Sequence, residues 1–163
     1  MPGKSRHSIT IDDIPQKENL FMISLIPKLY YDGLRTSKQI ADHFGQHIRH
    51  GHFLIHECKM LGWMDDEGLT EEGIRVAECR LEEERKLLIK KAVLKTPIIQ
   101  CLIRKYGQNI ITNPDKEKIA GFLFMDIGLA PSTAKRRSSS IIAWMKFLSD
   151  SANQSPKNAD DRC

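Results

Sequence analysis

The stretch RTSKQIADHFG, residues 35–45, decides how the first part of the chain folds. Thr36 and Gln39 have the spacing of a capping box, which predicts that a helix begins at Ser37. Gly45 is a favourable residue just after the end of a helix. The apolar stripe of this short helix consists of Ile40, Ala41 and Phe44. The stretch therefore predicts an amphipathic helix with two well-defined ends.

Elements of the same kind are predicted on both sides of this helix. Helical periodicity covers residues 17–31, where Pro27 should kink or break the helix. It returns over residues 48–61, although Gly51 weakens the first turn. A turn signal between two short apolar runs predicts a β-hairpin over residues 63–69. Three helices followed by a two-stranded wing is the order of a winged helix-turn-helix.

The first part also resembles a known family. The segments TSKQIADHFG, HFLIHECKMLGWM and EGLTEEG resemble those of many winged-helix proteins, in which LGW ends the recognition helix. The resemblance covers about residues 17–76 and implies the fold more strongly than any function.

The rest of the chain is predicted to be helical. Thr70 caps a helix expected to run to about Lys95, and Pro97 begins a shorter one. A further helix begins at Asn113–Pro114, and the last lies within residues 128–148. The predicted fold is mainly α: two helix-turn-helix units, the first with a hairpin wing, joined by a long helix. The expected divisions are a flexible segment (1–16), a winged helix-turn-helix (17–70), linker helices (71–106), a second helix-turn-helix (107–149) and a disordered tail (150–163).

The predicted helix over residues 48–61 carries a basic face. With Leu54 pointing inward, steps of 100° place four polar residues on the opposite face. They are Arg49, His52, His56 and Lys59. This face could contact a major groove, with Arg on guanine and His and Lys near phosphates. A solvated helix face is the alternative, and the acidic hairpin tip, DDEG, would be repelled by phosphates.

The last helix begins with three consecutive cations, Lys135, Arg136 and Arg137. Cations in a first turn oppose the helix dipole, whereas a phosphate-bearing partner would favour them. The predicted core stripe consists of Ala134, Ser138, Ile141, Met145 and Leu148. The predicted DNA-binding residues are Ser132, Lys135, Arg136, Arg137 and Ser139. Arg136 is expected to contact a base, with Lys135 and Arg137 on phosphates, although Arg137 stands at the boundary and could pack over the preceding helix instead.

This end of the chain has its own resemblance. PDKEKIAGFLFMDIGLAPSTAKRRSSSIIAWMKFL resembles the end of tandem winged-helix modules attached to bacterial restriction-modification and related DNA-binding proteins. The matching residues are Ser132, Thr133, Ala134, Arg136, Arg137 and Trp144. Together with the first part, the resemblance covers about residues 17–149. The chain departs from it after Leu148, where nothing resembles a wing, so the second unit is expected to be helical only.

Composition sets limits on the class of protein. The chain of 163 residues has a formal net charge of +4, a mild basic bias that is compatible with nucleic acid. Cys58, Cys79 and Cys101 lie among apolar residues and are expected to be buried thiols rather than a disulfide framework. No apolar segment reaches membrane-spanning length, so the protein is expected in the cytoplasm, or in the nucleus of a eukaryote.

Catalysis and metal binding are not expected. His52 and His56 stand at i and i+4 but lack a third ligand, so no zinc or other cofactor is predicted. The string PDKEK does not carry its carboxylates on strands, as a nuclease centre requires, and no phosphate loop, nucleophile elbow or HExxH motif occurs.

The sequence thus predicts sequence-specific binding of double-stranded DNA, as a transcription regulator or as the DNA-recognition part of a restriction-modification or defence system. The alternative is a winged-helix protein-interaction module within a larger complex. No membrane partner is expected. The chain could act as a monomer, or as a homodimer through its long helix.

Overall fold

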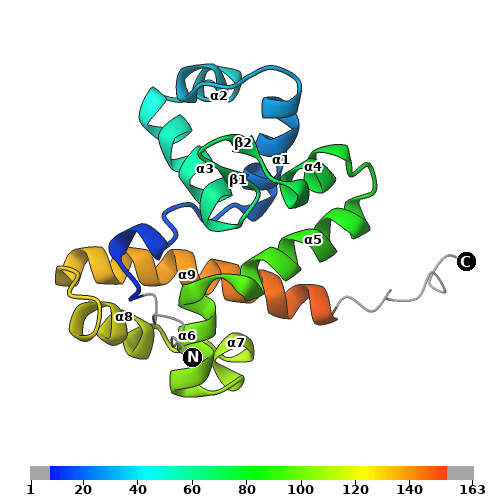
Figure 1. Cartoon of the computed structure of the whole chain (residues 1–163). Coiled ribbons are helices and arrows are strands. Elements are labelled where there is room, and N and C mark those ends of the chain that lie inside the picture. The colour runs from blue at the N-terminus through cyan, green and yellow to red at the C-terminus, as the bar shows by residue number, and fades with distance from the viewer. Residues whose placement is uncertain (1–7, 154–163) are drawn as a thin grey trace, which may run out of the picture.

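The computed structural model describes residues 8–153, which form a mainly α protein with one small hairpin, as predicted (Figure 1). The first part comprises a 3-10 turn, η1 (Ile11–Asp13), the helices α1 (Leu20–Tyr31), α2 (Ser37–His43) and α3 (Ile48–Met60), and the strands β1 (Met64–Asp65) and β2 (Gly68–Leu69). The second part comprises α4 (Glu71–Glu78), α5 (Glu82–Lys95), α6 (Pro97–Tyr106), α7 (Asn109–Thr112), α8 (Lys116–Met125) and α9 (Pro131–Asn153).

The capping box predicted at the start of α2 is present. The Thr36 hydroxyl accepts the Gln39 backbone N–H at 3.1 Å, and the Gln39 side chain accepts the Thr36 N–H at 3.1 Å. Gly45 follows the helix with φ +64°, a conformation that favours glycine. The local sequence therefore sets both ends of α2, as expected.

Gly51 has a role that helix propensity does not reveal. A Cβ atom at this position would overlap the backbone carbonyl of Ser37, at the start of α2. The glycine therefore allows α2 and α3 to pack with their backbones in close approach. Its conformational cost to α3 is offset by the contact that fixes the angle between the two helices.

The hairpin follows α3, where the sequence predicts it. Met64 pairs with Leu69 and Asp65 pairs with Gly68 in an antiparallel register. Thr70 then caps α4 by accepting the Gly73 N–H at 3.1 Å. The order of three helices and a hairpin is therefore as predicted.

The long helix predicted from residue 70 to residue 95 is wrong, because the chain breaks it into α4 and α5. Cys79 is extended, with φ −67° and ψ 123°, and the Arg85 guanidinium donates to its carbonyl at 3.0 Å. The break lets α4 pack against α1 while α5 packs against α6 and α9. Tertiary packing has overridden a helical pattern that contains no glycine or proline at the junction.

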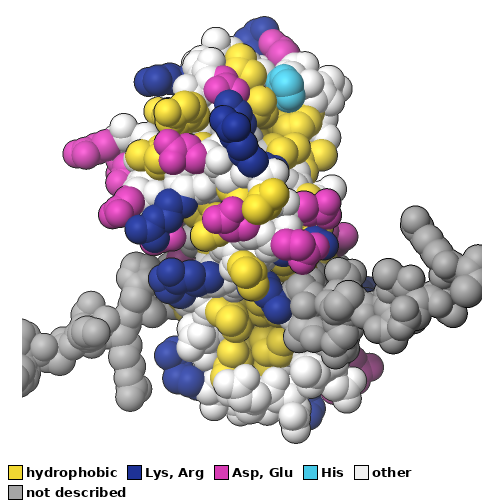
Figure 2. Space-filling view, turned by 90° about the vertical axis from the view of Figure 1, so that its right-hand side faces the viewer, with side chains coloured by type: hydrophobic (Ala, Val, Ile, Leu, Met, Phe, Trp, Pro, Cys, Tyr) yellow, Lys and Arg dark blue, Asp and Glu magenta, His cyan; other side chains and the backbone are white. Residues whose placement is uncertain are grey.

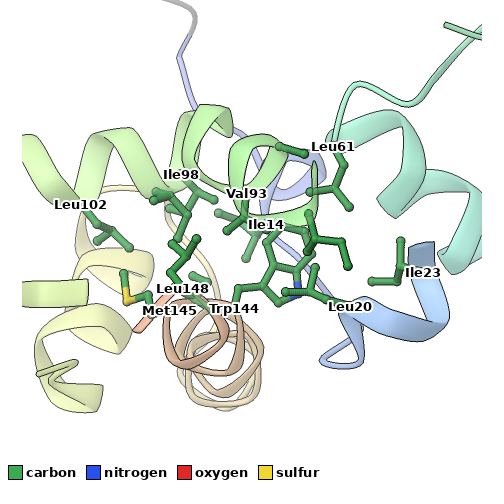
Figure 3. Packing of buried hydrophobic residues seen from close by; sticks show 14 of the residues in the cluster. Ile14, Leu20, Ile23, Leu61, Val93, Ile98, Leu102, Trp144, Met145 and Leu148 are labelled. Carbon is green, nitrogen blue, oxygen red and sulfur yellow. The ribbon is translucent and has the colours of Figure 1, made fainter. Parts of the chain in front are cut away.

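A continuous core joins the two parts, which are therefore more than two units held by a connecting helix. In Figure 3, Ile14 and Trp144 lie between Leu20 and Ile23 of the first part and Ile98 of the second. Ile14 and Trp144 are fully buried. Because Ile14 comes from the N-terminal segment and Trp144 from α9, the two ends of the described chain meet in the middle of the core.

The N-terminal segment is not the flexible extension predicted for residues 1–16, at least from residue 8 onward. Residues 8–19, which we call the strap, pass between α3 and α9 (Figure 1). Ile14 and Pro15 of the strap are buried. The following helix begins at Leu20 rather than near residue 17, with Asn19 as its N-cap, and it continues through Pro27 without a break.

Other boundaries also differ from the predictions. α8 begins after the N-cap Asp115, two residues later than expected, and α9 continues to Asn153, into the predicted tail. Residues 1–7 and 154–163 lie outside the described part, so Cys163 and most of the tail prediction do as well.

Cys58 and Cys79 are buried and Cys101 is half-buried, all as free thiols. Within residues 8–153, no helix has both the length and the apolar character needed to cross a membrane.

Candidate nucleic-acid interface

The predicted DNA-binding residues lie on two helices, α3 and the start of α9, and the strap passes between them (Figure 1). His56 of α3 contacts the strap at Asp12, and Arg137 of α9 contacts it at Ile14. The strap therefore connects the two basic helices, a link that the sequence did not predict.

On α3, the first half of the basic face is accessible. Arg49 and His52 are exposed, and the Arg49 guanidinium lies 5.4 Å from the centre of the Phe53 ring. At the other end of the helix, exposed Lys59 forms an ion pair with Asp66 of the hairpin at 3.1 Å. Arg49 and His52 are therefore the residues of this face that remain best placed for a partner.

The strap covers His56, against the prediction that this side chain lies on an open face. His56 is half-buried, and its Nε2 lies 2.7 Å from the carbonyl oxygen of Asp12, which accepts a hydrogen bond when that nitrogen is protonated. Nearly two turns earlier on α3, His50 contacts the ammonium of Lys17 through its Nδ1. The strap thus occupies part of the surface that a winged-helix protein would turn toward DNA.

Glu57 is the residue that holds the strap to α3, and the sequence analysis did not single it out. Its side chain is fully buried, and Oε1 accepts the backbone N–H groups of Gln16 at 2.6 Å and Lys17 at 3.1 Å. Burial raises the pKa of Glu57 to about 7, although these two hydrogen bonds and the charges of His56 and Arg137 oppose the rise. The sequence offered one signal for a role of Glu57: its carboxylate lies beside Leu54 and Cys58 on the inward side of the helix.

Arg137 holds the strap from the other side, so its side chain does not lie on the open surface that the predicted phosphate contact requires. Its side chain is only 6% exposed, and Nη1 donates to the Ile14 carbonyl at 2.8 Å. Burial lowers the pKa of Arg137, as does the neighbouring charge of Arg136, whereas Glu57 and Asp12 raise it. Two turns along α9, the Trp144 indole N–H donates to the Lys17 carbonyl at 2.9 Å. Arg137 and Trp144 therefore join α9 to the strap.

The start of α9 leaves three of the predicted residues on the surface. Ser132, Lys135 and Arg136 are exposed. Within the described residues, neither Lys135 nor Arg136 forms an ion pair, and the first turn of α9 has no acidic residue. Ser139 is half-buried, and its hydroxyl donates to the Lys135 carbonyl at 3.4 Å. The outward surface of this helix end is therefore smaller than predicted, and it is cationic.

The histidines do not assemble a metal site in the part of the chain that the structure describes. No group of three His, Cys, Asp or Glu side chains there is arranged to hold an ion. His52 is exposed, whereas His56 is engaged by the strap. The absence of a zinc requirement stays a prediction.

A family model described as "Domain of unknown function (DUF7226)" matches residues 22–153, and the chain belongs to this family. The match begins within α1, so the strap lies before it. No curated protein and no solved structure shows significant similarity to the chain.

Proposed function

We propose that this member of the DUF7226 family binds double-stranded DNA, with the start of α9 as the main contact. It acts by binding rather than by catalysis, either as a transcription regulator or as the DNA-recognition part of a restriction-modification or defence system. Lys135 contacts phosphates, and Arg136 contacts a base edge in the major groove.

The observation that carries the proposal is the pair of neighbouring, exposed cations Lys135 and Arg136 in the second turn of α9, which begins at Pro131 and not at the cations themselves. Within the described residues neither side chain forms an ion pair, and the first turn of α9 contains no acidic residue that could neutralise them. The contact with the strap explains why the third position of the run is a cation, Arg137. No such contact explains Lys135 and Arg136. A polyanionic partner would neutralise these two exposed and unpaired charges.

The first part of the chain could add a second contact. Arg49 and His52 are exposed on the half of α3 that precedes the covered His56. The strap contacts both α3 and α9, so these two residues lie on a helix that the strap connects to α9. Arg49 can donate two hydrogen bonds to a guanine, as Arg136 can.

The test begins with a selection from randomised duplexes and continues with titrations of the preferred site at several salt concentrations. We expect Arg136→Ala to weaken this binding by about 1–3 kcal/mol and to relax the preference at one base position. Arg80→Ala is the matched control, because Arg80 is an exposed arginine in the connection between α4 and α5, which lies on the opposite side of the molecule from the start of α9 (Figure 1). Equal losses for the two variants, or no salt-dependent binding to any duplex, would count against the proposal.

A second function, protein interaction by the first part, is supported by a separate observation. The hairpin places Asp65, Asp66 and Glu67 at the surface beside α3, where a DNA backbone would be repelled. In that case the first part would dock another subunit while α9 binds DNA. If Arg49→Ala together with His52→Ala leaves duplex affinity and site preference unchanged, the first part has this role.

A further inference from the structure

The outward face of α5 carries leucines that the fold does not bury. Leu87 is 65% exposed and Leu94 is 41% exposed, and they stand seven residues apart on one side of the helix. Leu81, the residue just before α5, is 67% exposed. The buried side of α5 consists of Ile89, Ala92 and Val93. α5 therefore has an apolar stripe on the side that faces away from the core.

The charges along α5 are divided by sign. Its first turn contains Glu82, Glu83 and Glu84, and its second half contains Lys90, Lys91 and Lys95. Lys86 forms ion pairs with Glu82 and Glu83. Within the described residues, Glu84 and Lys91 form no ion pair, and both are exposed. Steps of 100° along the helix place Glu84 and Lys91 beside Leu87, on the same outward side.

The leucines and charges of α5 are complementary to those of a second α5 that runs in the opposite direction. Leu81 and Leu94 lie six and seven residues on either side of Leu87. An axis of twofold symmetry beside Leu87 would therefore place Leu81 level with Leu94 of the second copy, with Leu81 at the edge of the stripe, about 120° around the helix from Leu87. The same axis places Glu84 opposite Lys91 of the second copy, twice, because a twofold interface repeats each contact. A parallel arrangement would instead bring like charges together.

We propose that α5 is a self-association surface, on which a second copy of this chain packs its own α5 in the antiparallel direction. The leucines supply the apolar contact, and the divided charges select the orientation. Figure 2, which looks onto the side of the molecule where α4 meets α5, shows hydrophobic side chains interspersed with acidic and basic ones. That mixture fits a reversible contact between copies better than a permanently buried interface.

The length of the helix limits the affinity. Its 14 residues span about 21 Å at about 1.5 Å per residue. A single pair of helices of this length buries less surface than a typical stable dimer. The dimer should therefore dissociate on dilution and weaken as salt concentration rises.

The first experiment measures the molecular mass of the full chain by sedimentation equilibrium over a wide range of concentrations. We expect a reversible monomer–dimer equilibrium, and we expect Leu87→Glu to increase the dissociation constant at least tenfold. Met125→Glu is the matched control, since Met125 is a 75% exposed residue at the end of α8 and should leave the equilibrium unchanged. Circular dichroism melts of both variants show whether folding is preserved. A wild-type chain that is monomeric at every concentration, or equal effects of the two variants, would overturn the proposal.

The second experiment tests orientation with charge reversals. Glu84→Lys alone and Lys91→Glu alone should each weaken self-association. In a dimer of either variant, positions 84 and 91 of the two copies carry charges of the same sign. An equimolar mixture of the two variants should associate again, since both positions of one variant then face the opposite charge in the other variant. No recovery in the mixture would overturn the antiparallel arrangement. A monomeric full chain that dimerises once residues 154–163 are removed would overturn the proposal for the full chain and assign the surface to the chain's own end instead.

Discussion

α3 and α9 each present a basic face by helical periodicity, yet the structure treats the two faces differently. On α3, His56 is covered by the strap and Lys59 is paired with the hairpin. On α9, the cations divide within one turn: Arg137 points inward to the strap, and Arg136 points outward. The difference arises from residues 8–19, which contact both helices although they lie far away in the sequence.

The comparison shows what a basic helix face can and cannot reveal. Spacing assigns each side chain to a direction, but it does not say which segment covers that direction. Arg137 is joined to Ile14 across 123 positions of the chain. The strap therefore determines which cations are available to a partner, and experiments on the strap test the comparison most strongly.

The largest effect is expected from Ile14→Ala. Ile14 is fully buried between α3 and α9, so its truncation should lower the free energy of unfolding by about 2–5 kcal/mol. Ile11→Ala is the matched control: Ile11 lies on the same strap but is 44% exposed, and its loss should cost about 0.5 kcal/mol or less. Chemical denaturation of both variants measures the difference. Similar values would mean that the strap does not hold the two helices together.

The next effect separates the neighbouring arginines of α9. Arg137→Ala should lower the free energy of unfolding by about 2–3 kcal/mol, because it removes a charged donor from the buried Ile14 carbonyl. Arg136→Ala should leave stability almost unchanged, since that side chain is exposed. In duplex titrations under conditions where both variants are folded, Arg136→Ala should weaken binding more than Arg137→Ala does. If Arg136→Ala is the more destabilising change, the division of the two residues is wrong.

Local sequence signals predicted much of this fold. The capping box at Thr36, the cap at Thr70 and the helix start at Pro97 are all observed, because each depends on residues a few positions apart. The break at Cys79 was not predictable in the same way. It depends on α4 packing on α1 and on the Arg85 contact with the Cys79 carbonyl. No nearby glycine or proline marks it.

The candidate site shows the same limit. The outward positions of Lys135 and Arg136 follow from the core stripe of α9, and the structure places both on the surface. For Arg137, helical spacing predicted only a position at the boundary between the core stripe and the outward face of α9. Its burial depends on the docking of the strap, in which Ile14 and Pro15 are buried and Glu57 binds the backbone. Polar composition alone suggested a flexible segment there.

A smaller, pH-dependent effect is expected from Glu57. Its pKa is raised in the folded protein from 4.5 to about 7, so the folded state holds a proton that the unfolded state releases. The contribution of Glu57 to stability is therefore greatest below pH 4.5 and falls as pH rises toward 7, by up to about 1.4 kcal/mol per pH unit.

The measurement compares denaturation of the wild-type chain and Glu57→Gln between pH 4 and pH 8. Gln keeps an oxygen that can accept the Gln16 N–H but cannot ionise, so the variant should lose the part of the slope due to Glu57. The difference between the two curves gives the contribution of Glu57. Parallel curves would show that the buried carboxyl does not titrate in this range.

The smallest effects compare one exposed lysine from each helix. Lys59 on α3 is paired with Asp66, so Lys59→Ala should lower stability by about 0.2–1 kcal/mol. Lys135 is an exposed, unpaired residue past the first turn of α9, so Lys135→Ala should change stability by about 0.5 kcal/mol or less. In duplex titrations, loss of Lys135 should reduce the salt slope by about one unit. Loss of Lys59 should reduce it less, because Asp66 already neutralises that charge. Equal slopes for the two variants would place both helices equally near the phosphates, and the contrast between a covered α3 and an open α9 would then not extend to DNA.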